Sequence, residues 1–234
     1  MKLILASILA LSTSALYAQK MPSYLSYLKK VRVAQYEYQI FGYDPANTKL
    51  INKPCENEKT HWACADGEYG AIIVATTNND NYAIVFNPGP SEDPEFSIYD
   101  KSKNLLESIG ANEFYITSGN IIYTAGISNQ MYNKRRKFTF KNGKFIEEKQ
   151  PFYYVGMKTK TTKNISLYKN KTGNEIIANL TPNYEIEVIL ADADPNSNDQ
   201  YYLVKTEFGL VGWLRLAEPY TYDTGIEDLR FNGD

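Results

Sequence analysis

The only histidine lies in a short loop bounded by the only two cysteines, in the sequence CENEKTHWAC. A zinc site needs three or four ligands, and a nucleophilic cysteine needs a base brought from elsewhere in the fold. His61, Cys55 and Cys64 supply neither set. An even, local pair of cysteines is typical of a disulfide in an exported protein. We therefore predict a Cys55–Cys64 disulfide that closes a polar loop, with His61 beside Trp62 and no metal site.

A second candidate is the stretch from Asp192 to Asn198, which carries oxygen side chains at alternate positions, as a calcium loop does. Its sixth position is Ser197 rather than glycine, and its twelfth is Leu203 rather than a bidentate glutamate. Proline and asparagine in this stretch favour turns. We interpret it as a polar loop between strands, and calcium binding stays open as the alternative.

The other charged groups indicate surface rather than catalysis. We interpret the basic run Lys134–Lys137 as a solvated strand edge, because alternation along a strand splits the four charges between two faces. Contact with phosphate or an acidic partner is the alternative. We assign two acidic pairs to the solvent faces of strands, Glu147–Glu148 and Glu185/Glu187. Neither a glycine-rich phosphate loop nor a nucleophile elbow is present. A carboxylate-dependent hydrolase remains an alternative, since carboxylate separations are invisible in a sequence.

The first eighteen residues have the organisation of an export signal. Lys2 supplies a positive start, residues 3–16 form an apolar run short for a bilayer span, and the small residues Ala15 and Ala18 suit a signal-peptidase site. A buried N-terminal helix is the alternative. We expect cleavage after Ala18 and a periplasmic or secreted product, with no membrane insertion after signal removal.

The amino-acid composition indicates which classes of partner the protein can bind. A net charge of −2 produces no global field that would draw the chain to nucleic acid or to an anionic membrane. The 20 tyrosines favour strands and offer contact surface. We therefore expect no nucleic-acid partner and no cofactor.

Strand patterns cover most of the chain after the export signal. Residues 31–40 alternate as one strand, and Ser118-Gly119 and Asn142-Gly143 predict hairpins. Strands at this spacing predict an antiparallel β domain over residues 19–155. Its further strand runs are GAIIVATT, YAIVF, FSIYD, NLLESI, EFYIT, NIIYTAG, KRRKFTF and KFIEE.

A predicted junction near residues 151–160 separates this domain from a second set of strands. Those strands are ISLYKN, EIIANL, YEIEVILAD, QYYLVKT and GWLRL. The acidic tail, residues 218–234, is expected to lie over the surface.

Residues 164–216 resemble the bacterial SH3-like (SH3b-type) domains that accompany many exported proteins. The run ISLYKNKTGNEIIANLTPNYEIEVIL is similar to that family's opening strands, and YYLVKTEFGLVGWLRL is similar to its closing hairpin. The matching positions are Tyr201-Tyr202, Val204-Lys205, Gly209, Gly212-Trp213 and Leu214. Tyr168 stands where the family usually has arginine, and Pro182-Asn183 where it usually has glycine.

The resemblance implies a small, strongly bent β-barrel over residues 158–217, which binds cell-wall peptides or proteins through an aromatic groove. Because a unit of about 60 residues is marginal alone, we expect it to dock on the first domain or to be covered by the tail. Our candidate ligand-binding residues are Tyr184, Asp192, Asp194, Tyr201 and Trp213. The acidic members would suit a basic peptide, and the competing interpretation is that about half of the aromatic residues are core.

We therefore predict an exported, mainly β, non-catalytic binding protein of the bacterial envelope. Its expected partner is a cell-wall peptide or peptidoglycan, or an envelope protein. An inhibitor or immunity-type protein that binds a secreted enzyme fits the same features and is the main alternative, ahead of a hydrolase.

Overall fold

The computed structural model describes residues 23–33, 36–64, 71–77, 81–89, 93–118, 121–192, 200–218 and 221–233. Within these ranges the chain is almost entirely β, with three sheets and no α-helix, which confirms the mainly β prediction. No helix in the described ranges is long and apolar enough to cross a membrane. The predicted export signal lies outside the described residues.

Sheet 1 has the strand order β1-β2-β8-β9-β10-β11. Its strands are β1 (Lys29–Val33), β2 (Tyr36–Tyr43), β8 (Glu113–Ile116), β9 (Ile121–Gly126), β10 (Lys134–Lys141) and β11 (Lys144–Glu147). The β2–β8 pair is parallel, and every other pair is antiparallel. The first domain is therefore not wholly antiparallel, because the five strands of sheet 2 intervene in the chain between β2 and β8.

Sheet 2 is an antiparallel meander in chain order. Its strands are β3 (Thr48–Pro54), β4 (Ile72–Thr77), β5 (Tyr82–Asn87), β6 (Glu95–Asp100) and β7 (Leu105–Gly110). Sheets 1 and 2 share one hydrophobic core, in which Phe96 of β6 stacks on Phe114 of β8 with ring centroids 4.8 Å apart. The two sheets thus form a β-sandwich.

Short segments cover the outer face of each sandwich sheet. Below sheet 2, the loop closed by Cys55 and Cys64 packs on Ile73 and Val85. Over sheet 1, the 3₁₀ turn η1 (Ser23–Leu25) and the residues after it bury Leu25 and Leu28 against Tyr115. Each cover removes apolar surface from water on a face that would otherwise be exposed.

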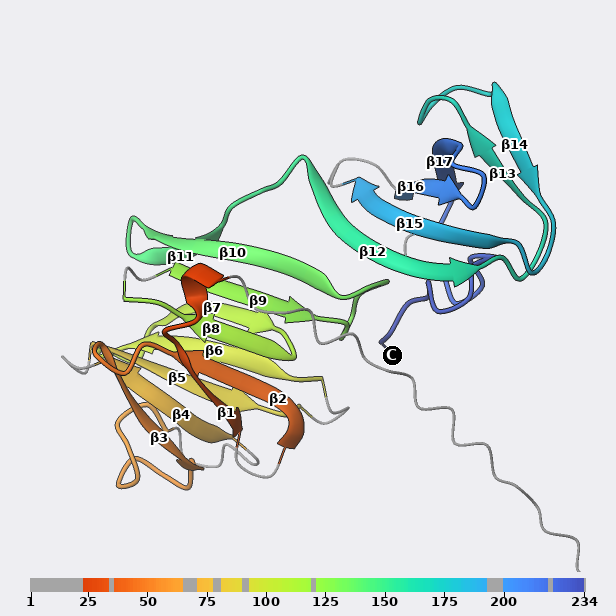
Figure 1. Cartoon of the computed structure of the whole chain (residues 1–234). Helices are drawn as coiled ribbons and strands as arrows, with labels where there is room; N and C mark the ends of the chain where they lie inside the picture. The colour runs from red at the N-terminus through yellow and green to blue at the C-terminus, as the bar shows by residue number, and fades with distance from the viewer. Residues whose placement is uncertain are drawn as a thin grey trace, which may run out of the picture.

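Sheet 3 has the order β12-β15-β16-β17-β13-β14 and curves strongly (Figure 1). Its strands are β12 (Phe152–Lys160), β13 (Ile165–Tyr168), β14 (Ile176–Leu180), β15 (Glu185–Asp192), β16 (Gln200–Thr206) and β17 (Val211–Leu216). Its edge strands β12 and β14 do not pair with each other in the described residues, so the sheet stays open rather than closing into the predicted barrel. The residues expected to form the junction are instead the edge strand β12.

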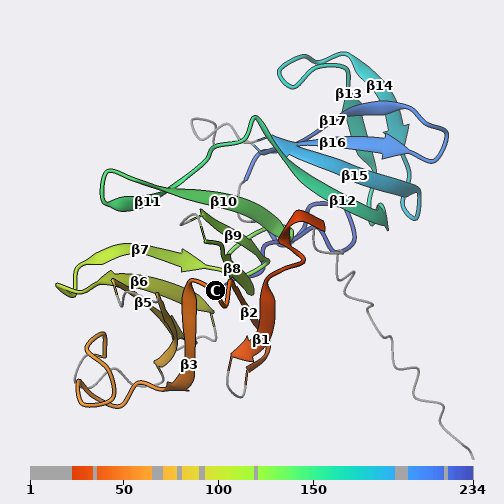
Figure 2. The same ribbon diagram turned by 60° about the vertical axis from the view of Figure 1, so that its left-hand side comes forward.

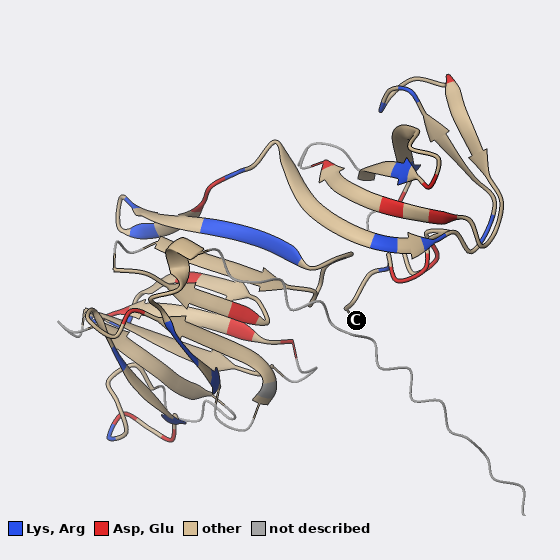
Figure 3. Cartoon of the chain, in the orientation of Figure 1, with Lys and Arg blue, Asp and Glu red and all other residues tan. Residues whose placement is uncertain are grey.

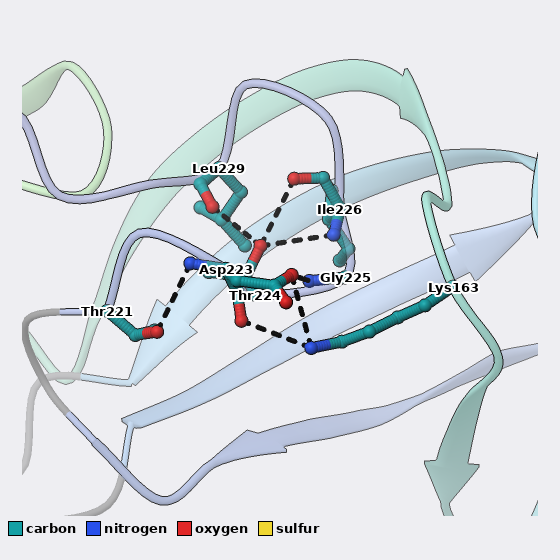
Figure 4. Close-up of polar contacts among 7 residues, drawn as sticks. All are labelled: Lys163, Thr221, Asp223, Thr224, Gly225, Ile226 and Leu229. Atoms are coloured by element: carbon teal, nitrogen blue, oxygen red, sulfur yellow. Dashed lines mark hydrogen bonds and ion pairs between the residues drawn. The ribbon is translucent and has the colours of Figure 1, made fainter.

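The C-terminal tail is partly core rather than surface cover. Ile226 and Leu229 are buried in the hydrophobic cluster of sheet 3. The buried hydroxyl of Thr224 holds the turn, because its single hydrogen is shared between the carbonyl oxygens of Leu229 at 2.6 Å and Ile226 at 3.1 Å, and its oxygen accepts from the Ile226 amide at 3.1 Å (Figure 4). The tail folds inward because its few apolar residues complete this core.

Two connections join sheet 3 to the sandwich. Strand β12 leads directly from β11 into sheet 3 (Figures 1 and 2). The tail then returns to the β9–β10 loop, where the Asn129 amide donates to the Asn232 carbonyl at 2.7 Å. Met131 and Tyr132 from that loop lie in the cluster of sheet 3. Sheet 3 thus packs against both the sandwich and the inward-folded tail.

Candidate functional site

Three of the five predicted ligand-binding residues meet around the ammonium group of a lysine. Lys171, in the turn between β13 and β14, places Nζ 2.6 Å from Oδ2 of Asp192. The same Nζ lies 5.9 Å from the ring centroid of Tyr201 and 5.8 Å from that of Trp213. These distances are those of an ion pair supported by cation–π contacts. The predicted cluster therefore forms, but it holds the chain's own cation.

Because Lys171 contacts Asp192, Tyr201 and Trp213, a ligand has little access to the predicted binding surface. The Asp192 side chain is only 8% exposed and its charge is compensated by Lys171, and Tyr201 is also buried. Phe152 lies beside Trp213, with ring centroids 6.2 Å apart. The rings of Phe152 and Trp213 are more accessible to solvent than that of Tyr201. A basic peptide would have to displace Lys171 before reaching the carboxylate.

The other two predicted residues do not join this cluster. Tyr184 precedes β15 at its opposite end, where its amide donates to Oγ1 of Thr161 at 2.9 Å and its carbonyl accepts from the Thr161 amide at 3.0 Å. Asp194 and the rest of the candidate calcium loop lie outside the described residues.

The cysteine loop forms as predicted. Cys55 and Cys64 are joined in a disulfide, with Cα atoms 5.4 Å apart. The His61 ring lies against Trp62, with centroids 5.0 Å apart, and its Nδ1 accepts from the Ala63 amide at 3.2 Å. In the described part of the chain, no three histidine, cysteine or acidic side chains cluster in a way that could hold a metal ion.

A groove of about 600 Å³ lies on the outer face of sheet 1, where the sandwich meets sheet 3. Its floor is formed by outward side chains of β8, β9 and β10. Strand register places them in two rows, Glu113–Ala125–Arg135 and Tyr115–Tyr123–Lys137. We call this groove the junction groove.

The walls of the junction groove come from distant parts of the chain. One wall is η1, where Tyr24 meets Tyr123 edge to face with ring centroids 6.1 Å apart. The other wall consists of Glu148, Lys149 and Gln150 from the β11–β12 connection, together with Tyr154 of β12. Ligand sites often form at such junctions between structural units.

The charges of the junction groove are unevenly paired. Its two carboxylates have partners, since Glu113 Oε2 accepts from the Tyr115 hydroxyl at 2.6 Å and Glu148 Oε1 lies 2.6 Å from Lys141 Nζ. Within the described residues, no carboxylate lies within ion-pair distance of Arg135, Lys137 or Lys149. Figure 3 shows the basic stretch of β10 in blue. The lining holds four cationic side chains and two carboxylates, so the groove carries a net positive charge.

Burial shifts the pKa values of Tyr115 and Arg135, but at neutral pH the tyrosine stays protonated and the arginine stays charged. Burial raises the pKa of the Tyr115 hydroxyl, and the hydrogen bond to Glu113 raises it further, so the hydroxyl stays a donor at neutral pH. Burial lowers the pKa of the Arg135 guanidinium, and Glu113 partly offsets that effect. Arginine nevertheless remains cationic in proteins.

The run Lys134–Lys137 is not the solvated edge that we expected. Strand β9 pairs on one side of it. On the other side, the carbonyl oxygens of Lys137 and Arg135 accept from the Glu148 amide at 2.8 Å and from Gln150 Nε2 at 3.0 Å. The expected alternation does occur, since Lys134 lies over the inward ring of Tyr153 at 4.5 Å while Arg135 and Lys137 line the groove. The prediction of a solvated strand edge was wrong because the β11–β12 connection folds back and hydrogen-bonds to β10.

A second hollow, of about 500 Å³, lies on sheet 3 and is lined by alternating lysines and glutamates. Two of its ion pairs are Lys205–Glu187 and Lys160–Glu227, each at 3.7 Å, and its three lysines stand against four glutamates. Internal compensation leaves less charge for a ligand than the junction groove offers.

Comparisons with protein families, with curated proteins and with solved structures found no match to this chain. The resemblance of residues 164–216 to SH3-like domains therefore stays a prediction. The chemistry of the site must be inferred from its own residues.

The ionisation of Glu148 in the junction groove differs from that of a general acid. A general acid at neutral pH needs a carboxyl group with a raised pKa. Here hydrogen bonds from Lys141 and Thr139 hold the pKa of Glu148 below its usual value, and the charge of Lys137 acts in the same direction. Tyrosine rings and cations supply contact surface and hydrogen-bond donors instead.

Proposed function

We propose that this protein is a non-catalytic binding protein of the bacterial envelope, and that the junction groove is its ligand site. One observation carries the proposal: Arg135, Lys137 and Lys149 have no ion-pair partner among the described residues, while both carboxylates of the groove are engaged. A net positive charge beside aromatic rings attracts an acidic ligand. Such an arrangement is typical of a binding site.

Periplasmic or secreted localisation is part of the proposal. It is supported by the apolar N-terminal run after Lys2 and by the disulfide, which persists in oxidising compartments. Sheet 3, which we propose to be an SH3-like module, contributes Tyr154 to the groove. Its own aromatic cluster around Trp213 is filled by Lys171.

Co-sedimentation of the mature chain, residues 19–234, with purified peptidoglycan sacculi tests the proposal. We expect the wild type to bind and Lys137→Ala/Lys149→Ala to lose most of that binding. A matched control is Lys49→Ala/Lys101→Ala, which removes the same charge from exposed positions in β3 and in the β6–β7 turn. Trp213→Ala should bind like the wild type. Binding that depends on Trp213 and not on the groove would place the site on sheet 3 and contradict the proposal.

One observation favours an inhibitor or immunity-type protein as the second candidate. The β16–β17 turn presents Phe208, whose side chain is 82% exposed, together with the partly exposed Leu210 and Val211. Exposed apolar groups at a hairpin tip are typical contacts for a protein partner. Under this alternative, Phe208→Ser would abolish a one-to-one complex with a secreted enzyme, and the sacculi would not sediment the wild type.

A further inference from the structure

We propose that the ligand of the junction groove is an acidic glycan chain. This inference rests on the proposed binding function of the groove and specifies its ligand class. It follows from three properties of the described residues: the backbone of the floor is already paired, the available polar groups are mostly donors, and two exposed rings flank the cations.

The floor offers no backbone partner to a ligand. Strand β9 pairs with β8 on one side and with β10 on the other. The outer carbonyls of β10 at Arg135 and Lys137 are taken by Gln150 and the Glu148 amide. An extended peptide gains affinity mainly by adding a strand to a free sheet edge. This groove lies on a sheet face rather than at an edge. A peptide bound in it could not form main-chain hydrogen bonds to a neighbouring strand.

The side chains select a negatively charged ligand rich in acceptors. Arginine and lysine are donors only, and Arg135, Lys137 and Lys149 supply them from the floor and one wall. The Glu113 carboxylate is engaged by Tyr115, and Glu148 by Lys141. Carboxylate and hydroxyl oxygens of an acidic sugar match this set. A neutral chain would leave the cations without a counter-charge.

The exposed rings suit the flat faces of sugars. Tyr24 is 62% exposed on one wall and Tyr154 is 47% exposed on the other. Each ring combines an apolar face with a polar hydroxyl, as a sugar ring combines C–H faces with hydroxyl groups.

Contacts within the fold hold both rings in place. Tyr24 rests on Tyr123, and Tyr154 lies so close to Gly156 that a Cβ there would come within 2.4 Å of the ring. Rings held in this way lose little conformational entropy on binding.

Single-stranded nucleic acid also combines negative charge with stacking bases. The whole chain carries a net charge of −2, and such binding normally depends on a broad positive field. The groove lining supplies only four cationic side chains, which favours a short segment of a weakly charged polymer.

Isothermal titration of the mature chain with a galacturonic-acid tetramer tests the inference. The comparison ligands are chitotetraose, a tetraglutamate peptide and a thymidine tetranucleotide. We expect the uronic-acid tetramer to bind more tightly than all three. Lys137→Ala/Lys149→Ala and Tyr154→Ala should each weaken its binding by about tenfold or more, because affinity depends on both the cations and the ring. Lys49→Ala/Lys101→Ala should leave it unchanged.

Equal or tighter binding of any comparison ligand would overturn the acidic-glycan inference. The inference also fails if the tetramer does not bind while sacculus binding still depends on Lys137 and Lys149, and in that case the proposed function survives. If sacculus binding is absent or independent of the groove, the proposed function itself fails. Thermal denaturation of each variant separates a lost contact from a lost fold.

Discussion

At the scale of single residues, the floor of the junction groove depends on a glycine in the adjacent strand. A Cβ added to Gly42 of β2 would lie 2.1 Å from Cδ1 of Tyr115, so the ring rests directly on the glycine backbone. Lys30 Nζ lies 5.5 Å from the centroid of the same ring. Tyr115 is thereby held flat, with its hydroxyl directed to Glu113. Glycine is required here for close approach rather than for an unusual φ.

We expect Gly42→Ala to displace Tyr115 and disturb the floor. Overpacking of this kind costs about 1–3 kcal/mol of unfolding free energy, and ligand binding in the groove should weaken with it. Gly110→Ala is the matched control, since a Cβ there meets only the Pro94 carbonyl oxygen at an ordinary 3.8 Å. Chemical denaturation measures both variants, and equal stabilities would contradict the described contact.

A second residue-scale prediction concerns the turn between β6 and β7. Asp100 accepts from Asn104 Nδ2 at 3.0 Å and from the Asn104 amide at 2.9 Å, and these bonds lower the pKa of its carboxyl group. A lowered pKa in the fold means that the interaction stabilises the protein above the unfolded pKa of about 3.9 and is lost as pH falls through the folded pKa. Asn104→Ala should raise the pKa of Asp100 toward its ordinary value. NMR titration of the carboxyl carbon measures it, and an unchanged pKa would refute the assignment.

At the scale of elements, alternation and turn residues predicted most strands correctly. The β8–β9 and β10–β11 hairpins form where Ser118-Gly119 and Asn142-Gly143 placed them, and in the second Asn142 and Gly143 have φ of 52° and 80°. These positive values are what a tight hairpin turn requires. The turn residues therefore predicted the positions of both hairpins correctly.

Three elements escaped the pattern for physical reasons. Residues 31–40 alternate continuously but form two strands, β1 and β2, which pair with each other from Val33 and Tyr36 onward. Strands β3 and β12 are edge strands, whose polar side chains resemble those of loops.

The candidate site was only partly visible in the sequence. Strand alternation places Arg135 and Lys137 on one face of β10, and the β8–β9 hairpin brings Tyr115 opposite Tyr123. The meeting of this floor with η1 and Tyr154 depends on packing between units. No local pattern encodes that contact.

The disulfide loop provides an element-scale prediction. Cys55→Ser/Cys64→Ser should lower the unfolding free energy by about 2.5–3 kcal/mol, because closing a loop of this length restricts the unfolded chain by that amount. Urea denaturation of the variant and of the oxidised wild type measures the difference. Adding reductant should destabilise the wild type and leave the double variant unchanged. A wild type indifferent to reductant would contradict the prediction.

At the scale of the whole molecule, the tail links the units that form the groove. The Thr162 amide donates to the Gly225 carbonyl and the Glu227 amide to the Lys160 carbonyl, both at 2.9 Å. Farther along, Asn232 and Gln130 form a bridge to the sandwich. A shift of sheet 3 would carry Tyr154 away from the floor of the groove.

We expect Thr224→Val to destabilise the protein by about 1–3 kcal/mol, because valine keeps the shape but leaves buried polar groups unpaired. Thr221→Val is the control, since Thr221 Oγ1 accepts only a 3.3 Å bond from the Asp223 amide at a more exposed site. The control should stay within about 0.5 kcal/mol of the wild type. Thermal unfolding measures the stability of both variants. An equal loss of unfolding free energy in the two would contradict the proposed role of the Thr224 hydroxyl in holding the turn.

NMR chemical-shift mapping tests the junction groove most directly. The ¹⁵N-labelled mature chain would be titrated with soluble fragments of peptidoglycan sacculi. We expect the largest shifts to fall on Tyr115, Tyr123, Arg135, Lys137 and Tyr154, and Lys137→Ala/Lys149→Ala to suppress them. Shifts centred on Trp213 and Lys171, with the groove unperturbed, would contradict the assignment of the ligand site to the junction groove.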